Sequence, residues 1–243
     1  MRHPKRKHWI VWSLLVLLSV SSAIQAYPAD PNNAALLYYQ AFISLPKEGA
    51  GDLRIPMGTD PNDQVRKYLV QCQPAIKLAV AASKLEHCDW GPLYSQGPQM
   101  SMAFLAQCRG MVFVLGADAA SRVADGHYRS ALERCLVICK MGRHIGDSDF
   151  TSYLVNGACN VAANKMIRDI LGLKPMHEPT LVWLQQQLAT VSGEEPSLSH
   201  ALLIEKEFML NILAQEDVNR LIEAVKQSQN NNPPSEWLDH FKK

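Results

Sequence analysis

Helical periodicity constrains this chain more than any other feature. Apolar residues recur every three or four positions along almost the whole sequence, and the strict alternation of a half-buried strand is scarce. Residues 99–124 are apolar on almost every side, which is typical of a helix in the middle of a bundle or array. The predicted helices span residues 33–45, 63–73, 73–86, 99–124, 128–144, 150–171, 178–191 and 197–226.

Turn-forming residues separate these helices and place several of their ends. Asn62 or Asp63 is expected to cap one helix, since short polar side chains accept hydrogen bonds from the N–H groups of a first turn. Pro74 has no N–H, so the pattern predicts a break near Gln73. Residues 46–61 form a long loop of Gly, Pro and Asp, and we expect it to cover a groove because loops of that length are often functional.

One predicted helix pair resembles a known repeat. Ala119 precedes the run Gly-x-Tyr-x-x-Ala-x-x-x-Cys-x-x-Ile at residues 126–138, which resembles the helix–turn–helix core of a tetratricopeptide repeat. The small residues would let two antiparallel helices approach closely, with Tyr128 filling the gap. Arg122 stands where that repeat usually has an aromatic residue, and no second copy follows at the period of about 34 residues.

The sequence therefore predicts an all-α fold in which antiparallel helix pairs pack as a solenoid-like, tetratricopeptide-like array rather than as a four-helix bundle. We expect one helical domain over residues 27–227. A polar linker and a short C-terminal helix are predicted over residues 228–243.

The first 26 residues have the order of features of a secretory signal. A basic stretch from Arg2 to His8 precedes an apolar run over residues 9–24, and small residues follow. The run is shorter than the roughly 20 residues that a membrane-spanning helix needs. Cleavage is expected after Ala26, with Ala23 as the alternative.

Such a signal predicts that the protein is exported and lies in the periplasm or outside the cell. The alternative is an uncleaved signal that anchors the chain in the inner membrane through residues 9–24. Both put the body of the chain across the membrane, because the basic flank stays inside. No other membrane contact is expected.

Charge disfavours nucleic acid as a partner. The chain has 24 basic and 23 acidic residues, and the first 26 residues contain four basic and no acidic ones. The remainder therefore has 20 basic and 23 acidic residues, without a basic stripe interleaved with aromatic residues. The neutralisation of phosphates needs an excess of basic residues on one surface.

Four segments carry a broader resemblance. Residues 33–41, 87–91, 131–135 and 143–147 read Asn-Ala-Ala-Leu-Leu-Tyr-Tyr-Gln-Ala, His-Cys-Asp-Trp-Gly, Ala-Leu-Glu-Arg-Cys and Arg-His-Ile-Gly-Asp. In these segments, and over most of the chain after residue 26, the sequence resembles a family of uncharacterised exported bacterial helical proteins. The resemblance implies export and a helical fold, and it implies no activity.

Six cysteines follow the predicted signal, and export would place them where disulfides persist. In an antiparallel helix pair, residues at equal distance from the turn lie opposite each other. Cys135 and Cys159 are centred on one predicted turn, and Cys72 and Cys108 are centred on the loop after residue 86. These two pairs are the disulfide candidates.

Two alternatives for the cysteines stay open. Most of the six could be small buried hydrophobic residues. Cys135 and Cys139, one turn apart on a helix, could instead bind a metal ion together with His144, although a fourth ligand is missing. No metal and no cofactor is predicted.

Strong catalytic motifs are absent from the sequence, so no catalytic residue is predicted. A first cluster, at residues 87–94, mixes titratable and aromatic side chains in a loop, which suits contact with a carbohydrate or a peptide. The alternative is a structural loop in which the tryptophan plugs the end of a hairpin and the aspartate caps a turn. The candidate ligand-binding residues of this cluster are His87, Asp89, Trp90 and Tyr94.

A second cluster contains Arg143, His144, Asp147 and Asp149. A histidine beside carboxylates can be tuned for acid–base chemistry, and His144 and Asp147 are its candidate ligand-binding residues. The same residues would also suit favourable pairing with helix dipoles and N-capping.

The predicted function is an interaction or scaffold module of the cell envelope that binds a protein or peptide, rather than an enzyme. This rests on analogy with other helical arrays. The alternatives are an enzyme or small-ligand binder that uses the His87–Tyr94 loop, and a purely structural envelope component.

Overall fold

The computed structural model describes residues 32–47, 51–91, 102–146, 148–192 and 196–215. The chain divides into two units, residues 1–31 and 32–243, and all described residues lie in the second. None of them belongs to a strand, so the predicted all-α class is confirmed for this part of the chain. The helices are α2 (Ala34–Ile43), α3 (Asp63–Ala82), α4 (Ala103–Ala124), α5 (Tyr128–Gly146), α6 (Phe150–Leu173), α7 (Glu178–Ser192) and α8 (Leu198–Gln215).

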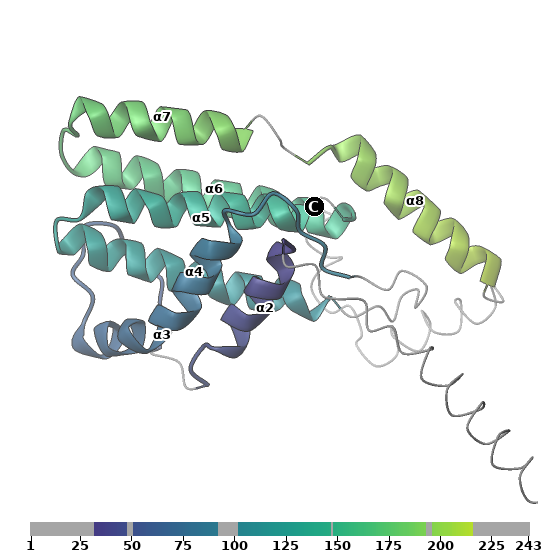
Figure 1. The fold of residues 1–243 in the computed structure, drawn as a ribbon, viewed down its shortest axis with the longest axis horizontal. Coiled ribbons are helices and arrows are strands. Elements are labelled where there is room, and N and C mark those ends of the chain that lie inside the picture. The colour runs from purple at the N-terminus through teal and green to yellow at the C-terminus, as the bar shows by residue number, and fades with distance from the viewer. Residues whose placement is uncertain (1–31, 48–50, 92–101, 147, 193–195, 216–243) are drawn as a thin grey trace, which may run out of the picture. The chain divides into compact units, whose positions relative to one another are not determined.

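From α2 to α6, each helix packs against the next one along the chain. The most extensive contact joins α5 to α6, followed by α4 with α5 and α2 with α3. Figure 1 shows α4, α5, α6 and α7 running side by side, while α2 and α3 cross next to α4. α7 packs on α5, and α8 packs on α6.

α4 is the central helix, as its apolar sequence predicts. It contacts α2, α3, α5 and α6 and buries twelve residues. Among the described helices it alone is long and apolar enough to cross a membrane by length and composition, yet 56% of that apolar stretch is buried by the protein. That burial is typical of a core helix.

The turn between α4 and α5 is closed by hydrogen bonds that need a glycine. Gly126 has a φ of 80°, which favours glycine over any residue with a side chain. Its N–H donates to the Val123 carbonyl oxygen at 3.0 Å, and the His127 N–H donates to the Arg122 carbonyl oxygen at 2.7 Å, as in a Schellman motif. Beyond this turn Ala119 and Ala131 are fully buried, so the two helices lie close together.

The predicted break near Gln73 is wrong, because α3 continues through Pro74 as one helix of 20 residues. Pro74 and Val70, one turn before it, are both exposed, so the carbonyl group that loses its donor faces solvent. On the opposite side Leu69, Cys72 and Ile76 are buried, and this packing holds the helix together.

Several predictions fall outside the described residues. These are the signal over residues 1–26, the end of the last long helix over residues 216–226, and the linker and short helix over residues 228–243. Tyr94 and Asp147 of the candidate sites also lie outside them.

Candidate functional site

The loop that contains His87 and Asp89 is fastened to the start of α2. Asn33 donates from Nδ2 to the Asp89 carbonyl oxygen at 2.9 Å and accepts from the Asp89 N–H at 2.9 Å. The Ala34 N–H donates to the His87 carbonyl oxygen at 2.9 Å. The Asp89 carboxylate accepts from the Gly91 N–H at 2.8 Å, so it is engaged in a local turn.

Trp90 is buried, with only 6% of its surface exposed. Its ring stacks on Phe104 with centroids 4.8 Å apart, and its Nε1 donates to the His144 carbonyl oxygen at 2.8 Å. Both the apolar body and the polar end of the indole are therefore satisfied inside the protein. We use the term aromatic cluster for Tyr38, Tyr39, Phe42, Trp90, Phe104 and His144.

His144 belongs to the same cluster and is 9% exposed. Its Nδ1 lies 3.1 Å from the Tyr38 hydroxyl oxygen. Burial lowers the pKa of His144 to about 4 and outweighs a hydrogen bond to the backbone of Leu85, which favours the protonated ring. The imidazole is therefore neutral at pH 7 and is shielded from solvent.

The structure thus joins Trp90 and His144, 54 residues apart, in one buried cluster. Asp149 has a local role at the start of α6. Its carboxylate accepts from the Ser152 N–H at 3.0 Å and from the Ser152 hydroxyl at 2.8 Å, which confirms the predicted N-cap.

The structure contains no disulfide between the six cysteines, so the pairs Cys72–Cys108 and Cys135–Cys159 stay predictions. Five are buried and Cys88 is half-buried. Burial raises the pKa of Cys88 and of Cys135 to about 12, and of Cys139 and Cys159 to about 11. A protonated thiol is a poor nucleophile and a poor metal ligand. The described residues contain no group of three His, Cys, Asp or Glu residues that could hold a metal ion.

A buried carboxylate, which the sequence analysis missed, ties three helices together. Asp118 of α4 accepts at Oδ2 from Nε of Arg122 and from Nε of Arg134 on α5, both at 2.7 Å. Its Oδ1 accepts from Nε2 of Gln73 on α3 at 3.2 Å.

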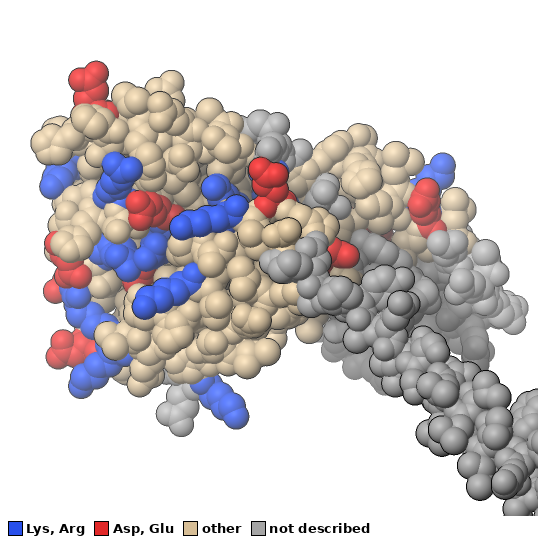
Figure 2. Space-filling model, viewed as in Figure 1, with Lys and Arg blue, Asp and Glu red and all other residues tan. Residues whose placement is uncertain are grey.

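Ion pairs nearer the surface are more exposed. Arg66 pairs with Asp60 and with Asp125, whose side chain is 48% exposed. Figure 2 shows Lys and Arg side chains interspersed with Asp and Glu side chains on the face in view. Such exposed pairs contribute little to stability.

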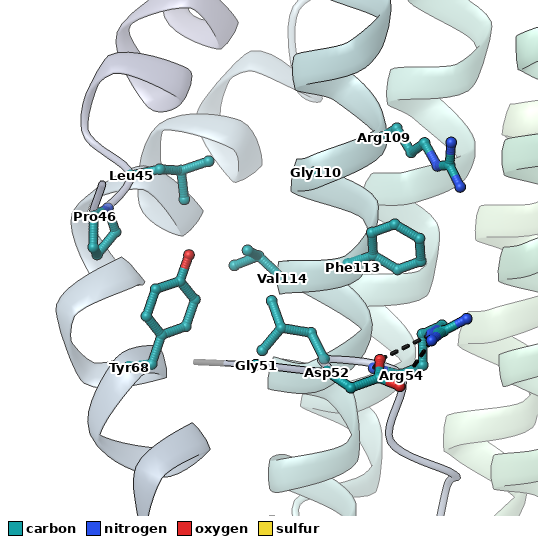
Figure 3. Close-up of a pocket in the computed structure, with 11 residues that line it drawn as sticks. Leu45, Pro46, Gly51, Asp52, Arg54, Tyr68, Arg109, Gly110, Phe113 and Val114 are labelled. Carbon is teal, nitrogen blue, oxygen red and sulfur yellow. Dashed lines mark hydrogen bonds and ion pairs between the residues drawn. The ribbon is translucent and has the colours of Figure 1, made fainter. Parts of the chain in front are cut away.

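An open groove of about 550 Å³ lies between the loop after α2, the start of α3 and one side of α4. Figure 3 shows Leu45, Pro46 and Tyr68 facing Phe113 and Val114 of α4 across it. We use the term loop–α4 groove for the space lined by Leu45, Pro46, Gly51, Asp52, Leu53, Arg54, Tyr68, Arg109, Gly110, Phe113 and Val114.

A second hollow of about 320 Å³ adjoins the loop–α4 groove and shares Leu53, Arg54 and Phe113 with it. The loop after α2 therefore runs along α4, and these three shared residues lie between the two hollows. The expectation that residues 46–61 cover a groove is met by this loop, which forms one wall of both hollows. The other residues of the second hollow are Ile55, Pro56, Met57, Val112, Gly116, Ala162, Lys165, Met166 and Asp169.

Polar groups in the loop–α4 groove are few and distinct. Asp52 and Arg54 form a two-point ion pair, with Arg54 Nε 2.8 Å from Oδ1 and Nη2 2.9 Å from Oδ2. The Arg109 guanidinium lies over the Phe113 ring, 5.8 Å from its centroid. Burial raises the pKa of Tyr68 to about 12, so its hydroxyl stays neutral.

Sequence reasoning found the loop of this groove but not the residues of α3 and α4 that complete it. One signal was present. In α4, which is otherwise apolar, only Arg109, Asp118 and Arg122 are charged, and the last two are paired with each other.

Comparison with known proteins adds no further assignment: no family model, no curated protein and no solved structure matches the chain.

Proposed function

We propose that the chain is an exported, non-catalytic module of the cell envelope that binds an extended segment of a protein or peptide in the loop–α4 groove. The observation that carries this proposal is the open groove of about 550 Å³ with its continuation of about 320 Å³. Both volumes lie near the range of roughly 300–1,000 Å³ that is common for ligand sites.

The dimensions of the groove suit a short stretch of extended chain. Residues 109–116 of α4 line the two hollows, and a helix of that length rises about 10 Å. An extended peptide advances about 3.3 Å per residue, so roughly three residues would lie along the track. Because the groove is open, the peptide could continue beyond it at both ends.

The packing of consecutive helices from α2 to α6 supports a solenoid-like, tetratricopeptide-like array as the scaffold. The proposed array rests on the close α4–α5 pair with its glycine turn. Arrays of this kind commonly bind partners along a groove between repeated helices. The analogy concerns the scaffold, and the groove residues carry the binding.

The contacts of the His87–Trp90 loop give less support to the alternative of an enzyme or carbohydrate binder. A stacking platform for a sugar must be exposed, whereas Trp90 and His144 are buried. These contacts favour a structural role for the loop.

Filling the groove tests the proposal. A Cβ added at Gly110 would meet no atom within 4 Å, and this position lines the groove, so Gly110→Phe should fill the groove without disturbing the fold. Peptides selected from a random display library on the full wild-type chain should lose binding to this variant by about tenfold or more. Gly157→Phe on α6 is the matched control, because that position is equally open and lies outside the groove. Equal binding by both variants would contradict the proposal.

Export has its own test. The intact mass of protein recovered from expressing cells should lack residues 1–26, and a full-length chain in the cytosol would contradict export. The two disulfides stay predictions that depend on that location. Alkylation of all six cysteines without a reductant would remove both.

A further inference from the structure

Among the lining residues that the structure describes, the charges of the two hollows are paired with one exception. Arg54 is neutralised by Asp52 through two contacts, and Lys165 lies 2.6 Å from Asp169. Arg109 is the remaining charged residue of the lining. Within the described part of the chain its guanidinium has no acidic partner and no hydrogen-bond acceptor. The described lining residues therefore carry one uncompensated positive charge.

The position of Arg109 suits recognition of an anion. Its guanidinium lies over the Phe113 ring at 5.8 Å, and this contact orients the planar group while its N–H edges stay available. A guanidinium edge matches a carboxylate with two parallel hydrogen bonds. The neighbouring wall, formed by Leu45, Pro46 and Val114, is apolar.

We infer that Arg109 binds the carboxylate of an aspartate or glutamate in the bound segment, next to a large apolar side chain that enters the groove. This inference rests on the proposed function and names the class of its ligand. Arg54 is unsuited to the same role, because Asp52 already occupies its donor edge.

Synthetic peptides test this inference. Peptides recovered from the display library on the full wild-type chain should be enriched in an acidic residue beside an apolar one. They are then made with an amidated C-terminus and with Glu, Gln or Lys at that position. Glu should bind about tenfold more tightly than Gln to the wild type, since a charge-assisted contact is lost, and this preference should weaken as salt is raised.

Variants of Arg109 assign the effect to this residue. Arg109→Gln should abolish the preference for Glu over Gln, and Arg109→Glu should reverse the order so that Lys binds better than Glu. Arg129→Gln is the matched control, because Arg129 is also an exposed arginine over an aromatic ring, 4.5 Å from the centroid of Trp183, and lies outside the groove. It should keep the wild-type preference.

The outcomes separate this inference from the function on which it rests. If Gly110→Phe blocks binding but Arg109→Gln keeps the preference for Glu, the groove binds peptides and the inference about Arg109 is wrong. Recovery of peptides without acidic enrichment also contradicts it. If no peptide is recovered, or if Gly110→Phe binds as well as the wild type, the proposed function itself fails.

Discussion

The aromatic cluster and the loop–α4 groove have similar ingredients and opposite surroundings. Each combines aromatic rings, polar side chains and a loop. In the aromatic cluster the indole N–H of Trp90 and the ring of His144 have partners inside the protein. In the groove the side chains face open space and Arg109 lacks an acidic partner among the described residues. The residue types in a loop therefore indicate a site only when their neighbours leave them accessible and unsatisfied.

The largest effect should come from removing the centre of the aromatic cluster. Trp90→Ala should lower the free energy of unfolding by about 3–5 kcal/mol, because it leaves a cavity and an unpaired carbonyl group at His144. Chemical denaturation measures this loss. Trp183→Ala, which truncates a half-buried ring on α7, should cost clearly less. Equal losses of stability in Trp90→Ala and Trp183→Ala would show that the aromatic cluster is no more important for stability than a half-buried ring.

Acid should destabilise the protein through His144. Its pKa of about 4 in the folded chain lies below the value of about 6.5 expected when it is unfolded. The unfolded chain therefore binds the proton more tightly. This contribution to stability is complete above about pH 6.5 and is lost as the pH falls towards 4, by about 3 kcal/mol.

Denaturation at a series of pH values measures the slope. In His144→Asn the slope between pH 6.5 and 4 should be flatter than in the wild type, whereas His200→Asn, at an exposed position, should keep the wild-type slope. A slope that His144→Asn leaves unchanged would mean that this ring is accessible to protons in the folded state.

A methyl group added at the contact between α5 and α6 should destabilise the protein. A Cβ at Gly142 would lie 2.7 Å from Cβ of Cys159 and 3.1 Å from Oδ1 of Asn156, so α5 and α6 would have to separate. Gly142→Ala should therefore lower the free energy of unfolding by about 1–3 kcal/mol. Thermal and chemical denaturation should agree, and a neutral result would show that this interface is loose.

The smallest effect is expected in the groove. Gly110→Ala should raise the free energy of unfolding by about 0.5–1 kcal/mol, because alanine favours the helix and the added Cβ meets nothing within 4 Å. Gly157→Ala should give the same gain. A loss at Gly110 alone would show that the groove is closed by the rest of the chain.

Three helix starts were predictable because their causes are local. Asn33, Asn62 and Asp149 each accept a hydrogen bond from an N–H within the following three residues, and such pairs can be recognised in the sequence. The break predicted near Pro74 was wrong because contacts distant in sequence decide whether the helix continues there. The local cost of Pro74 is real, but buried neighbours of α3 that are distant in sequence outweigh it.

The site could be predicted only in part. The loop over residues 46–61 can be recognised in the sequence by its length and composition. Tyr68, Arg109 and Phe113 line the same groove only because α3 and α4 pack beside this loop. Trp90 and His144 were candidate site residues because of their side-chain chemistry. Their burial depends on contacts with α2, which the sequence pattern does not predict. Accessibility is a property of tertiary packing, which residue spacing does not report.

The carboxylate of Asp118 has a consequence for how α4 is turned about its own axis. Asp118 follows Arg109 by nine positions, and at 3.6 residues per turn these two positions lie about half a turn apart around the helix. Gln73 of α3 and Arg134 of α5 bind Asp118 on one side of α4, so the helix cannot rotate about its axis. The opposite side, which carries Arg109, is therefore held in one orientation. A change at Asp118 that leaves the protein folded should therefore weaken the preference for an acidic peptide that we propose for Arg109.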